Sequence, residues 1–216
     1  MMTSLFSSFD PMSSIKQMNW MMMLSTMTIM PMNFWMKKSR WNMIKKKMEM
    51  KLTMEMNNST NHKEMLIMST SIFMLILINN MMGLFPYTFT STSHIVMSMS
   101  MALPMWMMLM IYGWTKFTNN MFKHLVPTGT PTPIMPMMVI IETVGNIIRP
   151  ISLSVRLTAN MIAGHLMMTL LGNMNEMKMM FLTMPTQTML MMFESSISII
   201  QAYVFSILMT LYSSEI

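Results

Sequence analysis

A series of long apolar segments constrains this chain more than any other feature of its sequence. Residues 65–85 and 95–115 contain no Asp, Glu, Lys, Arg or His, and each has about the twenty residues that an α-helix needs to cross a bilayer core. Of the 216 residues, 53% are hydrophobic and only 10% are charged, too few charges to cover a soluble domain. The sequence therefore predicts an all-α polytopic membrane protein.

The apolar pattern predicts five membrane helices within a single membrane domain over residues 1–216. The expected spans are 19–36, 65–85, 95–115, 137–172 and 185–212. We interpret residues 115–136 as a loop, because the run 127–133 is rich in Pro, Gly and Thr.

The last two predicted helices are unusually long. Residues 137–172 would form a helix of about 54 Å at 1.5 Å per residue, whereas the bilayer core is about 30 Å thick. Such a helix must tilt, lie partly in the membrane plane or bend, and Pro150 offers a bend. We therefore expect a long, steeply tilted antiparallel hairpin.

Residues 37–64 form a basic segment between two apolar spans. Eight of the 14 Lys and Arg residues lie there: Lys37, Lys38, Arg40, Lys45, Lys46, Lys47, Lys51 and Lys63. Apolar residues recur among them from Met43 to Met56 at a spacing typical of a helix on the membrane surface. Because basic residues favour the negative side of a membrane, we expect the N-terminus on the positive side and the C-terminus on the negative side. Lipid headgroups, not nucleic acid, are the expected partner.

Composition also excludes several kinds of chemistry. The chain has no cysteine, and its six glycines form no phosphate-binding loop. A copper site among the 44 Met residues is conceivable, but these Met are spread over the whole length, where they fill space in apolar runs. His62, His94 and His124 lack metal-ligand spacing. We expect no cofactor, no metal and no nucleotide site, so this chain is not predicted to catalyse a nucleotide reaction itself.

A polar stripe runs along the predicted 137–172 helix. Five residues fall within a band of about 80° on a helical wheel: Glu142, Asn146, Arg149, Arg156 and Asn160. The last helix carries a second stripe at i, i+4 and i+7: Glu194, Ser198 and Gln201. Because charged residues inside a membrane are costly, they normally face a partner or a water-filled cavity. The two helices are predicted to share a polar face.

One antiparallel register would bring three polar pairs to similar levels. These are Arg156 with Gln201, His165 with Glu194, and Glu142 with Glu215. Titratable groups would then approach from each side of the membrane, with a permanent positive charge between them. An arginine does not pass its proton onward, whereas His and Glu exchange protons. This is the layout of a proton path, and the missing intramembrane carrier implies a second subunit.

Several of these residues have simpler interpretations. His165 can be a satisfied packing histidine, Glu215 a solvated end residue, and Arg149 a group that only stabilises the bend before Pro150. Arg156 can be an interface arginine whose long side chain reaches water, although it lies far from both ends of its helix.

Two motifs resemble subunit a of the F-type ATP synthases, in its mitochondrial form. They are Arg156-Leu-Thr-Ala-Asn-Met-Ile-Ala-Gly-His-Leu166 and Ile200-Gln-Ala-Tyr-Val-Phe205. The opening Leu5-Phe-Ser-Ser-Phe-Asp-Pro11 is similar to invertebrate mitochondrial members. The resemblance is strong over residues 137–216 and looser upstream, where the pattern of spans still fits.

The resemblance implies a role for each candidate site residue. The family's essential arginine falls on Arg156, and its outer half-channel groups fall on His165 and Glu194. The remaining positions follow in the same way: the inner half-channel acid on Glu142, the amide positions on Asn160 and Gln201, and the terminal acid on Glu215. The implied carrier is the carboxylate on each subunit of a rotating c-ring.

The expected function is therefore that of a stator subunit with two offset half-channels, which couples proton flow to ATP synthesis. The resemblance also implies other membrane and stalk subunits as partners. It implies a mitochondrial inner membrane location, with the N-terminus in the intermembrane space and the C-terminus in the matrix. An independent proton-coupled secondary transporter is the alternative, but it predicts internal repeats around a midplane substrate site, and the sequence has neither. A purely structural subunit would not need an intramembrane Arg and Glu.

Overall fold

The computed structural model describes residues 6, 9–12, 18–24, 39–58, 63–85, 88–126, 129–173 and 180–215. Every regular element among these residues is a helix, so the all-α prediction is confirmed. Within this part of the chain, four helices are long and apolar enough to cross a membrane: α3 (Lys63–Gly83), α4 (Ile95–Lys116), α6 (Met135–Asn173) and α7 (Met180–Glu215).

The predicted first span at 19–36 is described only in part. Residues Met18–Leu24 form the 3-10 helix η2, and residues 25–36 lie outside the described residues. Trp20 of η2 packs its ring against Phe89 and His94, with centroid separations of 5.4 and 5.3 Å. The span at 19–36, the first of the five, therefore stays a prediction.

The basic segment contains a helix where one was predicted, α2 (Arg40–Asn57), and its place on the membrane surface stays a prediction. The Ser39 hydroxyl accepts a hydrogen bond from the Asn42 amide at 3.3 Å, which caps the first turn. At the other end, Met56 is buried, and the Ser69 hydroxyl of α3 donates to its sulfur at 3.4 Å. The helix is thus attached to α3 by its C-terminal end, and most of its lysines remain exposed.

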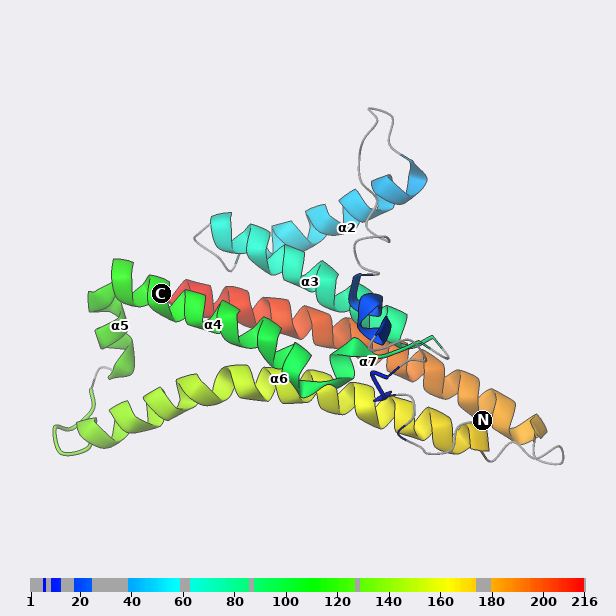
Figure 1. Cartoon of the computed structure of the whole chain (residues 1–216). Helices are drawn as coiled ribbons and strands as arrows, with labels where there is room; N and C mark the ends of the chain where they lie inside the picture. The colour runs from blue at the N-terminus through cyan, green and yellow to red at the C-terminus, as the bar shows by residue number, and fades with distance from the viewer. Residues whose placement is uncertain are drawn as a thin grey trace.

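The four long helices pack in antiparallel pairs. α3 lies along α7, and α4 lies along α6 (Figure 1). Their shared core is formed by Phe73, Ile76, Ala102, Leu109, Leu153, Leu157, Ala202, Phe205 and Met209. Small hydroxyl residues are buried at the same interfaces, and each bonds within its own helix, as when Ser206 donates to the Tyr203 carbonyl at 2.8 Å. Small residues let helix backbones approach closely.

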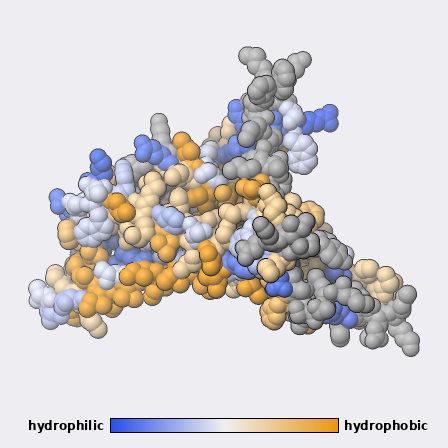
Figure 2. Space-filling view, in the orientation of Figure 1, coloured by the Kyte–Doolittle hydropathy of each residue, from blue (hydrophilic) through white to orange (hydrophobic). Residues whose placement is uncertain are grey.

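The predicted hairpin is present, since α6 and α7 run antiparallel (Figure 1). Pro150 lies inside α6, which curves along its length in the figure. A proline removes one backbone hydrogen bond and bends a helix. Large apolar side chains are exposed along this helix: Ile140, Ile141, Val144, Ile147, Ile148, Ile151 and Val155. Figure 2, in the orientation of Figure 1, shows a hydrophobic lower edge where α6 runs. The steep tilt of the hairpin remains a prediction.

Two predicted boundaries are wrong. The segment 115–136 is not all loop, because residues Thr118–Leu125 form helix α5. The rings of Trp114 and Phe122 pack edge to face with a centroid distance of 5.2 Å, which joins the end of α4 to α5. Turn propensities describe single residues and do not predict such a contact between two segments. Similarly, α7 begins at Met180 and not at residue 185, because the helix continues through Pro185.

Candidate functional site

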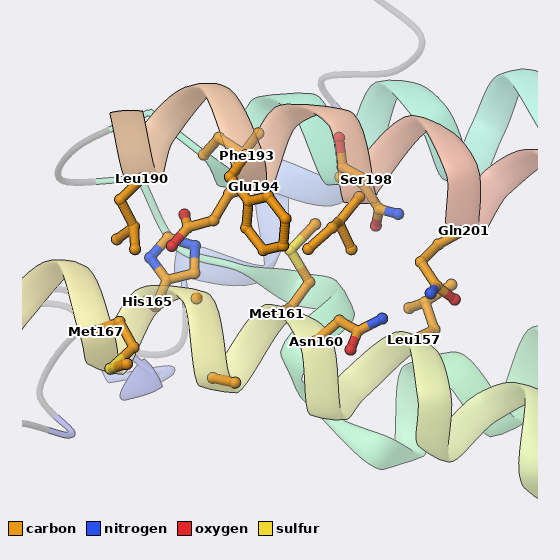
Figure 3. Close-up of a pocket in the computed structure, with 15 residues that line it drawn as sticks. Leu157, Asn160, Met161, His165, Met167, Leu190, Phe193, Glu194, Ser198 and Gln201 are labelled. Atoms are coloured by element: carbon orange, nitrogen blue, oxygen red, sulfur yellow. The ribbon is translucent and has the colours of Figure 1, made fainter. Parts of the chain in front are cut away.

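A cavity of about 200 Å³ lies where α3, α6 and α7 meet (Figure 3). We call it the three-helix cavity. Its polar lining residues are Asn80 from α3, Asn160 and His165 from α6, and Glu194, Ser198 and Gln201 from α7. All three residues of the predicted α7 stripe line this cavity, but Asn160 is the one member of the predicted α6 stripe that does. His165 and Asn80, which neither stripe included, complete the polar lining.

His165 and Glu194 lie at one end of this cavity and point toward one another from α6 and α7 (Figure 3). Glu194 is only 9% exposed. Within the described part of the chain, the Nε2 atom of His165 and the Oε1 atom of Glu194 are buried and have no hydrogen-bond partner. The antiparallel register that placed these two residues at one level agrees with this arrangement.

Gly164 permits the close approach of α6 to Glu194. A Cβ atom added at this glycine would lie 2.9 Å from Cδ and 3.0 Å from Oε1 of Glu194. Such distances are shorter than van der Waals contact, so a side chain here would displace the carboxyl group. The glycine that precedes His165 in the first motif is therefore needed for the packing of the site.

Two further segments surround His165. The backbone of Gly83 in α3 lies close to its ring, and the ring of Phe9 packs edge-on against it with a centroid distance of 6.1 Å. The Phe9 carbonyl also lies 3.1 Å from Nε2 of His94. Sequence reasoning missed Phe9, Gly83 and His94, because none of them belongs to a polar stripe.

Asn160 and Gln201 lie toward the other end of the cavity (Figure 3). Leu157, which is 3% exposed, lines the cavity beside them. The adjacent Arg156 does not line it. Asn160 is one turn from Arg156 along α6 and lies on the cavity side of that helix, and Gln201 lines the same cavity from α7.

Arg156 is exposed at the surface of α6. Among the described residues it has no ion-pair or hydrogen-bond partner. Val155, the preceding residue, is 45% exposed, while Leu153 is 6% exposed on the buried side. The guanidinium group therefore belongs to the face of α6 that is not covered by the other described helices.

Glu142 lies on the far side of the bend and has a different environment. Its Oε1 atom is 3.4 Å from Nη2 of Arg149. The Arg149 guanidinium lies over the Tyr212 ring of α7, 4.6 Å from its centroid, and that ring packs against Trp106 of α4 at 4.7 Å. Arg149 thus links Glu142 to α7 directly and to α4 through Tyr212. Its contacts therefore extend further than the bend before Pro150. Tyr212 and Trp106 belong to neither polar stripe, so the sequence pattern could not identify them as part of this site.

The remaining predicted residue, Glu215, is the last residue of α7, and its side chain lies outside the described residues. Across the part of the chain that the structure describes, no three His, Asp or Glu residues are grouped so that they could hold a metal ion.

The fold and the site define a class: an all-helical, multi-span membrane protein whose two longest helices carry titratable residues on both sides of an arginine. Comparison with known proteins gives the family. The family model described as ATP synthase A chain matches residues 17–214. The chain is 49% identical to ATP synthase subunit a of Locusta migratoria and 48% identical to that of Drosophila melanogaster. It is 46% identical to that of Anopheles quadrimaculatus, and each of these alignments covers all of both chains. The chain belongs to the ATP synthase A chain family.

Membership fixes the general function. The chain is a proton-translocating membrane subunit of the ATP synthase, and the alternative of an independent transporter is not favoured. It assembles with other ATP synthase subunits and is a multi-pass protein of the mitochondrial inner membrane.

Proposed function

We propose that this chain provides two offset half-channels, one on each side of Arg156, which deliver protons to carboxylates of a rotating c-ring and receive them back. The observation that carries the proposal is the separation of three environments along α6. His165 lines a buried cavity, Arg156 is exposed and unpaired among the described residues, and Glu142 lies beyond the bend. At 1.5 Å per residue, Arg156 lies about 13 Å from His165 and about 21 Å from Glu142 along the helix.

The outer half-channel, on the positive side of the membrane, would contain the three-helix cavity. Glu194 and His165 exchange protons there, and Asn160 and Gln201 extend the hydrogen-bonding lining toward the level of Arg156. The unpartnered Nε2 and Oε1 atoms support this assignment, since a buried polar atom without a partner is satisfied best by water or a proton.

Arg156 would be the barrier between the half-channels. Its side chain keeps its charge, so it opposes the direct passage of a proton and attracts an ionised carboxylate. The apolar face of α6 around it, rich in exposed Ile and Val, is suited to a helical partner in lipid. The c-ring is the partner that the proposal assigns to this face.

The inner half-channel would begin at Glu142, with Glu215 as a further carboxylate near the negative side. In this orientation the basic helix α2 and the C-terminus face the matrix, and the N-terminus faces the intermembrane space. The span at 19–36 and the tilted hairpin complete the proposed single membrane domain.

The absence of cysteine in the chain permits a direct test of sidedness. Leu190, which lines the three-helix cavity, lies one turn from Glu194, and Asn146 lies one turn from Glu142. In vesicles containing the assembled ATP synthase, a membrane-impermeant thiol reagent on the positive side should label Leu190→Cys and not Asn146→Cys. Reagent on the negative side should label only the second variant. The reverse pattern would invert the orientation, and no labelling of either site from either side would contradict the two water-accessible paths.

A further inference from the structure

The N-terminal segment around Phe9 contacts the titratable end of the three-helix cavity through one aromatic side chain. The Phe9 ring packs edge-on against the His165 ring, with a centroid distance of 6.1 Å and an interplanar angle of 85°. Phe9 is not among the residues that line the cavity, so its contact with the site is made through His165. An edge-to-face contact favours one relative orientation of two rings over others.

Two hydrogen bonds from other elements hold the backbone of this segment. The Nε2 atom of His94, the N-cap residue of α4, lies 3.1 Å from the Phe9 carbonyl oxygen. A carbonyl oxygen only accepts, so this nitrogen donates. The next carbonyl, that of Asp10, accepts a hydrogen bond from the Asn19 side chain of η2 at 3.2 Å. Two consecutive carbonyls are therefore tied to two separate elements, which fixes the backbone that carries the Phe9 ring.

His94 is itself held by two aromatic rings. The centroid of its imidazole lies 5.3 Å from that of the Trp20 ring and 5.4 Å from that of the Phe89 ring. The rings of Trp20 and Phe89 also contact each other, with a centroid distance of 5.4 Å. Three rings in mutual contact restrict the rotation of the imidazole. A chain of contacts thus runs from the start of α4 through Phe9 to His165.

We infer that Phe9 is a positioning residue of the outer half-channel: held by His94, its ring keeps the His165 imidazole turned toward the carboxyl group across the cavity (Figure 3). This inference rests on the proposed function of His165 and Glu194. Proton exchange requires the two groups within hydrogen-bond reach, directly or through one water. An imidazole that rotates about its side-chain bonds moves its nitrogens out of that reach. Phe9 carries no exchangeable proton, and its role is to limit this rotation.

The titratable side chains around this contact are Glu194, which lines the cavity, Asp10, which is exposed, and His94. Because His94 is titratable, the test must separate positioning from proton transfer. Gln at this position keeps an N–H donor for the Phe9 carbonyl but does not titrate in the physiological range, whereas Leu has no donor. The two substitutions at His94 therefore differ in the hydrogen bond and not in the loss of titration.

Phe6 provides a matched control. It is the same residue type three positions earlier, its ring centroid lies 6.5 Å from that of Phe9, and it is 61% exposed. A substitution that acts only through the folding or insertion of the N-terminal segment should affect both positions similarly. A substitution that acts through His165 should affect Phe9 alone.

The test compares Phe9→Leu, Phe9→Tyr and Phe6→Leu in vesicles, with each rate expressed per assembled ATP synthase. We expect Phe9→Leu to lower proton-driven synthesis about fivefold, a part of what a positioned acid or base contributes. It should also require a higher proton concentration on the positive side for half-maximal rate. Phe9→Tyr keeps the ring and should retain most of the rate, and Phe6→Leu should match the unmodified chain. If Phe9→Leu does not assemble, Phe9→Met takes its place with the same expected outcome.

Substitutions at His94 test the contact that holds Phe9. His94→Leu should resemble Phe9→Leu, and His94→Gln should retain most of the rate. Because His94 acts through Phe9, the double variant with Leu at both positions should be about as slow as the slower single variant. A double variant that shows the product of the two effects would overturn the link between them.

Equal rates and equal proton dependence for Phe9→Leu and Phe6→Leu would overturn the inference. His94→Gln as slow as His94→Leu would also overturn it, since the titration of His94 and not its hydrogen bond would then matter. Glu194→Gln is measured in parallel. If it slows synthesis while Phe9→Leu does not, only the role of Phe9 fails. If Glu194→Gln has no effect, the proposed function of the cavity fails, and the role of Phe9 fails with it.

Discussion

The titratable residues at the two ends of the α6–α7 hairpin have opposite environments. At the three-helix cavity, His165 and Glu194 face each other around a space, and each has a buried polar atom without a protein partner in the described structure. Beyond the bend, Glu142 is paired with Arg149, whose guanidinium lies over Tyr212. At one end the titratable side chains border a cavity, and at the other they are held by protein contacts.

The difference shows that a polar stripe does not assign the same role to all its members. Arg149 and Arg156 lie on one stripe of one helix, yet Arg149 is engaged with Glu142 and Tyr212, while Arg156 is exposed. An arginine that already has partners is poorly placed to attract a carboxylate from another subunit. The comparison therefore separates the arginine that organises the chain internally from the one available to a partner.

The largest expected effect is at Arg156. Arg156→Lys should reduce proton-driven ATP synthesis by on the order of a hundredfold or more, because an ammonium on a flexible stem lacks the planar guanidinium fork. Synthesis would be measured in vesicles with a proton gradient of fixed size. Arg40→Lys in α2 is the control and should leave the rate unchanged. Near-normal synthesis by Arg156→Lys would remove Arg156 from the barrier role.

Glu194→Gln sharpens the comparison at the cavity end. The substitution keeps size and hydrogen bonding but removes the exchangeable proton, and a positioned acid or base contributes on the order of a hundredfold or more to a proton-transfer step. We expect the rate to become limited by protons on the positive side and to rise when their concentration is raised. Glu142→Gln should instead respond to the negative side. A response of both variants to the same side would show that they do not lie in separate half-channels.

Gly164→Ala tests how closely the two helices must approach at the cavity. The new methyl group would meet Glu194 at 2.9 Å, and overpacking of this kind costs about 1–3 kcal/mol. We expect a lower thermal stability of the assembled complex and a slower rate, by roughly tenfold at most. Gly172→Ala is the matched control, since a Cβ there has nothing within 4 Å. Equal effects of both variants would show that the cavity tolerates a larger separation of α6 and α7.

The smallest effect is expected from Arg149→Gln. A partly exposed ion pair contributes about 1 kcal/mol or less, so synthesis should fall by no more than about fivefold. Tyr212→Leu, which removes the ring beneath the guanidinium, should have a similar effect, whereas Tyr212→Phe keeps a ring face and should not. A loss as large as that of Arg156→Lys would place Arg149 at the barrier and erase the distinction between the two arginines.

The amino-acid sequence by itself determined the membrane class, the positions of α3, α4 and α6, the helix α2 in the basic segment and the two polar stripes. These features follow from hydropathy and from the 3.6-residue period, which act within a single helix. For the same reason, the antiparallel register that places His165 level with Glu194 could be predicted, since it requires only two long helices of known direction.

Only the tertiary structure decided which side chains meet. A position on a helical wheel gives a direction from one axis, but it does not say which other helix lies in that direction or at what distance. Phe9 at His165, Tyr212 beneath Arg149 and helix α5 in the predicted loop all depend on contacts between separate elements. Asn80 stands next to Asn79 in a largely apolar run that has no polar stripe, and only the packing of α3 against α6 and α7 makes it part of the cavity.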